Sequence, residues 1–414
     1  MLLEGLKVVE MSTWIAAPGC AMIMAEWGAD VVKVEGPEGD AIRRFYPDTE
    51  ESPGNPIFSM ENRGKRGVVL DVYKPEGRAA LIALLQVSDV FVTNLRPGAL
   101  TRTRLDYASV KDECPHLIYA CVTGFGLEGD NIDKPAFDLT GFWNYTGIAA
   151  STIPPDVEPF TCRPGFGDHV TALATLSGIL AALNERHTTG KGRLVEASLV
   201  RAGVYALAWD TSIHARYGEA TVAQPRSARP TAVGGYFRLG DGKQICVSPR
   251  GAECYPGIMK GLGLEWTLED PNLRPPLADM TQVRKLRGLV DDAYAKMTIE
   301  EAGAMLTAAD VIWGPFASLD DVAIDPQMRA AGCFVSTPDR FGGAFEAPAA
   351  PIRFGGLDIE PRRPAPGLGE HTREVLMEAG LPEGKVDALL ESGAAGGARE
   401  VEMRLRPDLA QKQS

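Results

Sequence analysis

The sequence lacks the features that mark several large classes of protein. Its formal net charge is −13, from 42 Lys and Arg against 55 Asp and Glu, so the chain as a whole has no electrostatic attraction to nucleic acid or to anionic membranes. The five histidines show no metal-ligand spacing, and we expect no metal. No G-x-S-x-G segment occurs, so the serine hydrolases that use this motif are not indicated.

Cysteine is scarce and scattered. The seven cysteines occur without C-x-x-C spacing, and an odd number cannot all pair, which argues against a disulfide framework or a zinc site and favours reduced, buried thiols. The amino-terminal segment shows no basic and apolar leader, and no uninterrupted apolar run reaches about 18 residues. We therefore expect a cytoplasmic protein without a membrane-spanning helix.

What the sequence does contain is an alternation of short apolar runs with helical patterns. Helices are expected at Cys20–Trp27 and Glu76–Gln86. The strands predicted within residues 1–200 are Leu6–Glu10, Val31–Glu35, Gly67–Asp71, Val90–Thr93, Leu117–Val122 and Gly192–Ala197. Strand, helix and strand in close succession form a βαβ unit, whose strands are parallel. The alternation therefore predicts an α/β fold with a doubly wound parallel sheet.

The later part of the chain divides at a polar stretch. Long helical patterns cover Asp168–Arg186 and Leu199–Tyr217. Residues 219–231, with two prolines and two arginines, resemble a linker, and Gly240-Asp241-Gly242 then marks a hairpin. We expect a large domain over 1–218, a linker over 219–231 and a small α+β domain over 232–325. A return linker and the rest of the large domain follow over 326–392, with a poorly ordered tail over 393–414.

Residues Gly124 to Gly129 match the pattern G-x-G-x-x-G and follow a predicted strand. A dinucleotide fold also needs a helix that opens immediately afterwards, so that its N-terminus meets the pyrophosphate. The polar stretch up to Pro135 is not helical in pattern. We interpret the segment as a loop at the carboxyl end of a strand, a position that favours ligand contact, and rank a nicotinamide-dependent dehydrogenase as the weakest candidate function.

Basic residues gather near glycines at several predicted strand ends. Lys65 and Arg66 stand just before one strand, Arg96 stands just after another, and Arg43 with Arg44 follows a third. Such residues suit a bound phosphate, because a guanidinium group chelates phosphate in a bidentate manner. Ordinary surface ion pairs would give the same pattern, so both interpretations stay open.

The segment Gly165-Phe166-Gly167-Asp168-His169 places an acidic residue at the expected start of a long apolar helix. One interpretation is structural, because Asp is a preferred N-cap worth about 1 kcal/mol. The other is catalytic. A helix N-terminus favours an anion, so the carboxylate should stay ionised, and the glycines leave one side open. An ionised, accessible carboxylate can act as a covalent nucleophile. His169 is a candidate base, although a single His beside a helix start is more often structural.

Together these motifs resemble the family III CoA transferases, which include formyl-CoA transferase and the carnitine and bile-acid CoA transferases. The resemblance covers residues 1–380. The matching segments, in chain order, are 5–10, 28–35, 62–71, 94–98, 135–138, 167–168, 189–192 and 366–371.

The resemblance implies a large Rossmann-like domain built from both ends of the chain, a smaller α+β domain, and a homodimer of two interlocked open rings. It implies that Asp168 attacks an acyl-CoA thioester to give an acyl-aspartyl anhydride and then an aspartyl-CoA thioester, from which CoA passes to a second carboxylic acid. Coenzyme A is then a co-substrate, and no prosthetic group is needed. The positions expected to contact CoA are Ala17, Arg43, Lys65, Arg66, Asn94, Arg96, Arg102, Phe125, Gly126 and Lys134.

Racemases that act on 2-methylacyl-CoA share this fold and are the chief alternative. They move a proton with a His at the position of Phe137, and phenylalanine cannot carry a proton, so transfer is favoured. A non-catalytic CoA-binding protein, in which Asp168 is only a helix cap, is a further alternative. Residues 137–148 resemble the members that handle aryl-lactate and other 2-hydroxy acids. Only Gly234 and Gly235 remain of the glycine run of the formyl-CoA members, which predicts an acyl group larger than formyl or oxalyl.

Overall fold

The protein is described from a computed structural model that covers residues 1–45, 55–219, 222–274, 277, 279–357 and 359–397. Contacts group the chain into two compact units. The first comprises residues 1–151, 158–221 and 330–414, and the second comprises residues 152–157 and 222–329. These groupings describe contacts and not independent folding, so the domain boundaries expected from the sequence stay predictions.

The first unit contains a seven-stranded sheet in the order β12-β3-β2-β1-β4-β5-β6. Its strands are β1 (Lys7–Met11), β2 (Asp30–Glu35), β3 (Arg66–Leu70), β4 (Val90–Thr93), β5 (Ile118–Thr123), β6 (Leu194–Ser198) and β12 (Ala395–Gly396). All neighbouring pairs are parallel except β12 with β3. The predicted α/β class with a parallel sheet is thereby confirmed.

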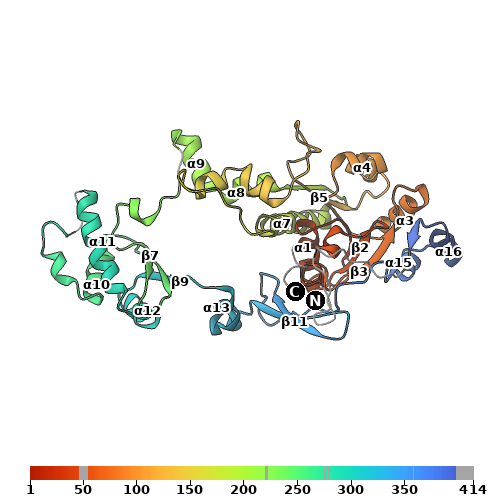
Figure 1. Ribbon diagram of the computed structural model, residues 1–414. Coiled ribbons are helices and arrows are strands. Elements are labelled where there is room, and N and C mark those ends of the chain that lie inside the picture. The colour runs from red at the N-terminus through yellow and green to blue at the C-terminus, as the bar shows by residue number, and fades with distance from the viewer. Residues whose placement is uncertain (46–54, 220–221, 275–276, 278, 358, 398–414) are drawn as a thin grey trace, which may run out of the picture. The chain divides into compact units, whose positions relative to one another are not determined.

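Helices cover both faces of this sheet (Figure 1). Alternate strand residues point to opposite faces. Val8 and Val31 pack in one apolar cluster with α1 (Ala16–Glu26) and α7 (Phe166–Thr189). Val9 and Val32 pack in the other with α3 (Pro75–Gln86), α15 (Thr372–Glu378) and α16 (Glu383–Glu391). The two buried faces explain why the strands read as continuous apolar runs rather than alternating ones.

The remaining elements of the first unit are short. They are η1 (Ala41–Arg44), α2 (Pro56–Asn62), α4 (Pro97–Thr103), α5 (Tyr107–Val110), the π-helix η2 (Leu139–Asn144), α6 (Ile148–Thr152), α8 (Leu199–Ala206), α9 (Ala208–Tyr217), β10 (Phe334–Pro338) and β11 (Ala344–Pro348). The strands β10 and β11 form an antiparallel pair.

The second unit has its own apolar core. Its sheet is antiparallel in the order β7-β8-β9. The elements from this part of the chain are η3 (Arg226–Ala228), β7 (Gly235–Arg238), β8 (Gln244–Ser248), η4 (Ala252–Cys254), α10 (Tyr255–Gly261), η5 (Glu265–Leu268), α11 (Met280–Tyr294), α12 (Ile299–Ala308), β9 (Ile312–Pro315), α13 (Leu319–Ile324) and α14 (Pro326–Ala330).

Several element boundaries differ from the sequence predictions. Helix α1 begins at Ala16 rather than Cys20, because Pro18 fits the first turn, where its missing N–H costs no hydrogen bond. The predicted helix Leu199–Tyr217 is two helices that meet at Leu207. The poorly ordered tail was expected to begin at residue 393, which is too early, because β12 at residues 395–396 pairs with β3. Residues 398–414 lie outside the described part of the chain.

Helix α7 is long and apolar enough, by length and composition alone, to cross a membrane. The core helices of globular proteins pass the same test. Here α7 packs on α1 through Ala172, Leu176 and Ile179, which are all buried. We therefore interpret α7 as a core helix.

Candidate active site

The carboxyl ends of β1, β4 and β5 lie side by side in the sheet. After β1 the chain passes through α1 to β2 on one side, and after β4 it continues to β5 on the other. This reversal of strand order is the usual place for a ligand in an open parallel sheet. The loops after β1 and β4 are tied together there, because Thr13 donates to Asn94 Oδ1 at 2.9 Å and Asn94 Nδ2 donates to the Thr13 carbonyl at 2.6 Å.

Three predicted CoA contacts with charged side chains follow β4 and β5. Arg96 precedes α4, Arg102 lies in its last turn, and both are exposed. Lys134 is also exposed, and its Nζ lies 5.3 Å from the ring centre of Phe125 and 5.7 Å from that of Tyr145, a cation–π arrangement. Across the described residues, none of these three cations pairs with a carboxylate within 4.0 Å.

Three uncharged predicted contacts lie at the same end of the sheet. Ala17 is fully buried in the first turn of α1, whereas Asn94 is half-buried. Gly126, in the loop after β5, has a φ of +99° and donates to Thr123 Oγ1 at 2.8 Å. The segment around it is a loop, as expected, and no helix opens after Gly129. The topology thus gathers these positions near one edge, while their contact with CoA stays a prediction.

Carboxylates already bind the other basic residues that were predicted to contact CoA. Lys65 is 0% exposed and donates to Glu10 at 2.6 Å, to the Pro18 carbonyl and to Asn62. These bonds use all three ammonium protons. Arg43 forms a two-bond pair with Glu35 at 2.8 and 2.6 Å.

Arg66 is engaged in the same way by three carboxylates. It pairs with Asp30, Glu374 and Glu378, at 2.6, 3.0 and 2.7 Å. A phosphate could reach Arg43, Lys65 or Arg66 only by displacing these partners, so the ion-pair interpretation fits all three as they stand in this structure.

Lys65 belongs to a buried charge network. Glu10 also binds Lys33 at 2.9 Å, and Lys33 lies 3.0 Å from Asp40. Burial pushes the pKa of Glu10 upward, but Lys33 and Lys65 outweigh it and hold that pKa at about 2. Asp40 in turn accepts from the backbone of Trp14 at 3.2 Å. The network therefore fixes the loop that follows β1.

Asp168 lies in the first turn of α7 but does not cap it. The helix begins at Phe166, and Gly165 is the N-cap with a φ of +89°, a conformation that glycine adopts without steric cost. The interpretation of Asp168 as an N-cap is therefore wrong. Gly167 is required for a different reason, because a Cβ there would lie 2.4 Å from the Phe142 ring.

Asp138 takes the capping role. Its carboxylate accepts from the N–H groups of Gly165 at 2.8 Å and of Gly167 at 3.3 Å. Asp138 is buried and stands just before η2, far from α7 in sequence. The sequence marked its segment as part of a family motif, but no local pattern could reveal that it caps a helix 27 residues downstream.

The Asp168 carboxylate is not simply ionised, as the sequence analysis expected. Burial, and next the neighbouring Asp138 carboxylate, raise the pKa of Asp168 to about 7, while His169 acts in the opposite direction. Asp138 already accepts the N–H groups of Gly165 and Gly167 at the helix start. At neutral pH the protonated and ionised forms of Asp168 therefore coexist in comparable amounts.

His169 is hydrogen-bonded to Glu61, which lies on α2, and the contact is an ion pair when His169 is protonated. The distance from His169 Nε2 to Glu61 Oε1 is 2.9 Å, and the Glu61 side chain is 1% exposed. This hydrogen bond is the largest cause that raises the pKa of His169. Glu61 could not be recognised from the sequence, because nothing in the spacing of residues 61 and 169 indicates that α2 and α7 meet.

An apolar side-chain group borders this region. Trp14 has a φ of +68°, uncommon for a bulky residue and a form of strain that gathers at functional sites. Its ring packs edge-on against Phe137 at 5.0 Å and Phe45 at 5.9 Å. Phe137 directly precedes Asp138 in the chain, and the Ile15 side chain reaches Gly165.

Comparison with known proteins agrees with this arrangement. A family model described as CoA-transferase family III matches residues 3–372. The (R)-2-hydroxy-4-methylpentanoate CoA-transferase of Clostridioides difficile is 34% identical over 95% of this chain and 99% of its own. The cinnamoyl-CoA:phenyllactate CoA-transferase of Clostridium sporogenes is 28% identical over 94% of this chain and 96% of its own.

A solved structure shares the fold along almost its whole length. The crystal structure of a CAIB/BAIF family protein from Brucella suis superposes with a TM-score of 0.80 and 29% identity, covering 91% of this chain and 99% of that one. The family resemblance inferred from the sequence is thus confirmed. A family model that matches most of the chain, with relatives that align along nearly all of it, makes this protein an enzyme of CoA-transferase family III.

Proposed function

We propose that this enzyme moves CoA from an acyl-CoA thioester to a free carboxylic acid with Asp168 as the nucleophile. The observation that carries the proposal is the position of Asp168, partly exposed in the first turn of α7 beside Asp138 and the His169–Glu61 pair. In its ionised form the carboxylate attacks the thioester carbonyl, the C–S bond breaks, and the CoA thiolate leaves. The product is an acyl-aspartyl anhydride.

The thiolate then attacks the aspartyl carbonyl of this anhydride and releases the first acid as a carboxylate. The resulting aspartyl-CoA thioester is attacked by the carboxylate of the acceptor acid, which gives a second anhydride and again frees the thiolate. Attack of the thiolate on the acceptor's acyl carbon forms the new acyl-CoA and returns Asp168 as a carboxylate. Every step exchanges one acyl bond for another, so the sequence balances without a metal or a redox partner.

For CoA itself we propose contacts after β4 and β5. The exposed cations Arg96, Arg102 and Lys134 suit the phosphates, and Phe125 supplies an aromatic face beside Lys134. Asn94, Gly126 and Ala17 line the neighbouring strand ends. Arg43, Lys65 and Arg66 would first have to leave their carboxylates, so their predicted contact with CoA is the weaker part of the proposal.

We further propose an acyl group larger than formyl or oxalyl. Trp14, Phe45 and Phe137 form an aromatic group that is partly open, with Phe137 54% exposed. Burial of an apolar acyl chain against such rings is favourable at roughly 25 cal/mol per Å² of apolar surface. The relatives named for (R)-2-hydroxy-4-methylpentanoate and phenyllactate support branched or aryl 2-hydroxy acids as substrates.

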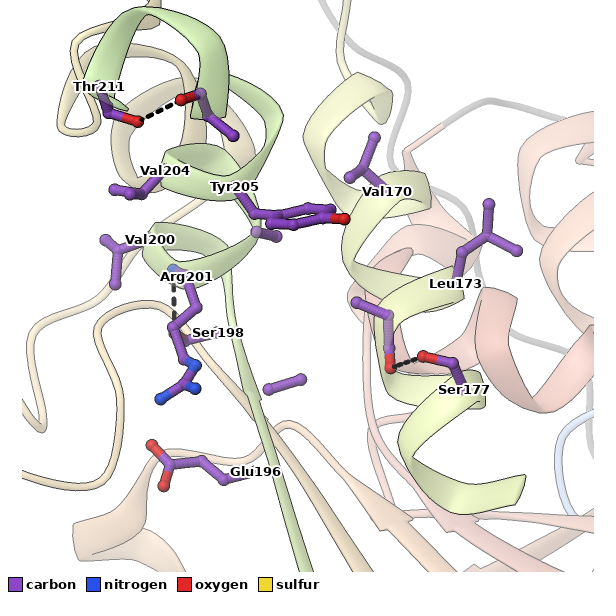
Figure 2. A pocket seen from close by; sticks show the side chains of 14 residues that line it. Val170, Leu173, Ser177, Glu196, Ser198, Val200, Arg201, Val204, Tyr205 and Thr211 are labelled. Atoms are coloured by element: carbon purple, nitrogen blue, oxygen red, sulfur yellow. Dashed lines mark hydrogen bonds between the residues drawn. The ribbon is translucent and has the colours of Figure 1, made fainter. Parts of the chain in front are cut away.

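We also propose a cytoplasmic homodimer. Helix α9 buries none of its residues, Tyr205 is 82% exposed and Trp209 is 81% exposed. Figure 2 shows an open groove beside these helices, with Tyr205 of α8 directed toward Val170 of α7. The groove measures about 1090 Å³ and is lined by α7, β6, α8 and α9. Exposed aromatic side chains beside an apolar groove suit an interface between two copies of the chain, and sedimentation should give twice the mass of the chain.

Mass spectrometry of reactions in D2O tests the proposed reaction. A panel of acyl-CoAs is incubated with and without free acids, including 2-hydroxy-4-methylpentanoate and phenyllactate. We expect a new CoA ester that appears only with the acid and carries no deuterium at the α-carbon. Deuterium at the α-carbon without added acid would instead establish a racemase, and CoA binding without turnover, unchanged by Asp168→Asn, would establish a binding protein.

A further inference from the structure

Glu61 is a buried acid whose hydrogen-bonding capacity is only partly used by the residues around it. Its Oε2 is buried and has no hydrogen-bond partner among the described residues, while its Oε1 meets only His169, at 2.9 Å. Ionised carboxylates are costly to bury unless they are paired. The remaining oxygen faces Gly19 of α1, where a Cβ would lie 2.8 Å from it. The glycine therefore leaves room for the carboxylate.

His169 connects this buried acid to the proposed nucleophile. It follows Asp168 directly in α7 and is half exposed, with 47% of its side chain accessible. The Gly165 backbone also acts on the ring in the direction that favours its protonated form. The ring is therefore held by the buried Glu61 through Nε2 while part of it stays open to solvent.

We propose that Glu61 and His169 are a positioning pair that holds a positive charge beside the Asp168 carboxylate and thereby keeps this nucleophile available at neutral pH. This inference rests on the proposed function of Asp168. In this proposal Glu61 does not touch the reacting atoms. It favours the ionised form of Asp168 through His169, against its own direct repulsion of that carboxylate. The positive charge is needed because the Asp138 and Glu61 carboxylates both raise the pKa of Asp168, whereas His169 lowers it.

Three further titratable groups, Asp138, Cys162 and Lys65, act on this site. Asp138 reaches it from the segment before η2, and Cys162 from the segment before α7, where burial and both aspartates raise the pKa of its thiol. Lys65 acts on Glu61 from the amino end of β3. Burial lowers the pKa of Lys65 to about 8, so its titration falls on the alkaline side. The acid limb of a pH profile therefore reports chiefly on Asp168 and His169.

The first measurement is NMR titration of the full-length protein labelled with ¹³C in its histidines, without substrate. His169→Gln identifies the resonance of His169 by its loss. We expect a pKa above the ordinary 6.5 in the native protein and a fall toward that value in Glu61→Gln. Gly19→Ala should give the same fall, because its methyl group displaces the Glu61 carboxylate. The matched control is Gly384→Ala on α16, where a Cβ meets nothing within 4 Å.

The second measurement is the pH profile of kcat/KM, with (R)-2-hydroxy-4-methylpentanoyl-CoA as donor and 4-methylpentanoate as acceptor. In His169→Gln the acid limb should move to higher pH. We expect about tenfold lower kcat/KM at pH 6 and a difference within about twofold at pH 9, because one pKa unit changes the ionised fraction tenfold. A structural role would instead lower the rate equally at every pH.

The outcomes separate this inference from the proposed function. If His169 titrates at its ordinary value and Glu61→Gln does not change it, the positioning pair is wrong even when transfer is observed. A uniform loss of kcat/KM in His169→Gln, without movement of the limb, also overturns it. If the donor and acceptor show no transfer while the NMR result is as expected, the charge pair stands and the choice of reaction or substrate has failed.

Discussion

The basic residues near β2 and β3 differ from those that follow β4 and β5 in what neutralises them. Arg43 and Lys65 lie within carboxylate pairs that are almost fully buried. Arg96, Arg102 and Lys134 are exposed and, in the described part of the chain, lack a carboxylate partner. In the sequence Lys65 and Arg96, one from each set, both stand near glycines at strand ends. The difference teaches that the position of a charge in the chain does not tell whether it serves the fold or a ligand.

The physical reason is desolvation. Removing an ammonium group from water costs several kcal/mol, which is recovered only when opposite charges and hydrogen bonds surround it. Lys33 and Lys65 share Glu10, and Asp40 completes the neighbourhood of Lys33. Such a set fixes the loop after β1. An exposed arginine has lost little hydration, so it retains the capacity to bind a phosphate.

The largest expected effect comes from removing one charge from the buried network of Glu10, Lys33, Asp40 and Lys65. Lys65→Met leaves part of the Glu10 charge uncompensated, and we expect a loss of about 3–5 kcal/mol in the free energy of unfolding. The measurement is urea denaturation at pH 7. Lys134→Met, which removes an exposed ammonium, should change stability by less than about 0.5 kcal/mol. Equal stability of both variants would remove the distinction between the two sets.

Asp168 stands between these extremes, since it is partly buried and incompletely neutralised. Its pKa of about 7 lies above the ordinary value near 3.9, so the folded state binds the proton more tightly than the unfolded state. The contribution of Asp168 therefore makes the free energy of unfolding fall as pH rises from about 4 to 7. Asp168→Asn should abolish transfer, yet raise the free energy of unfolding at pH 8 by about 1–3 kcal/mol.

Thermal and urea unfolding of Asp168→Asn at pH 4.5 and pH 8 measure this effect. The gain should fall to about a quarter of its pH 8 value at pH 4.5, where the native Asp168 is protonated and the unfolded chain is only beginning to bind this proton. A suitable control is Asp320→Asn, an exposed acid in the first turn of α13, which should lose a few tenths of a kcal/mol through the helix dipole. A gain that is the same at both pH values would show that Asp168 is not held with a raised pKa.

The parallel sheet could be predicted from the sequence because local patterns carry it. Apolar runs such as Val90–Thr93, separated by helical patterns, indicated six strands of the sheet within a residue or two. The short strand β12 could not be predicted, since Ala395 and Gly396 have little strand propensity and are held only by pairing with β3. Tertiary contact decides such an element.

Only part of the candidate site could be predicted, again the part that local sequence patterns indicate. Asp168 stood out because glycines and a helix pattern surround it. Asp138 and Glu61 did not, since their roles arise from hydrogen bonds across 27 and 108 residues of chain. Burial, and next the Asp138 carboxylate, explain why the pKa of Asp168 lies higher than a helix start alone suggests.

The smallest expected effect tests the exposed set. Arg96→Ala should raise KM for an acyl-CoA about tenfold, equivalent to about 1.4 kcal/mol, with no change in unfolding free energy, because its side chain is solvated and makes no ion pair within the described structure. The same acyl group on pantetheine, which lacks the nucleotide phosphates, should show no change in KM. Arg193→Ala, an exposed arginine that pairs with Glu185, should leave both values unaltered. If Arg96→Ala weakens both thioesters equally, the residue acts on the pantetheine arm or on the loop after β4, and the phosphates must be held elsewhere.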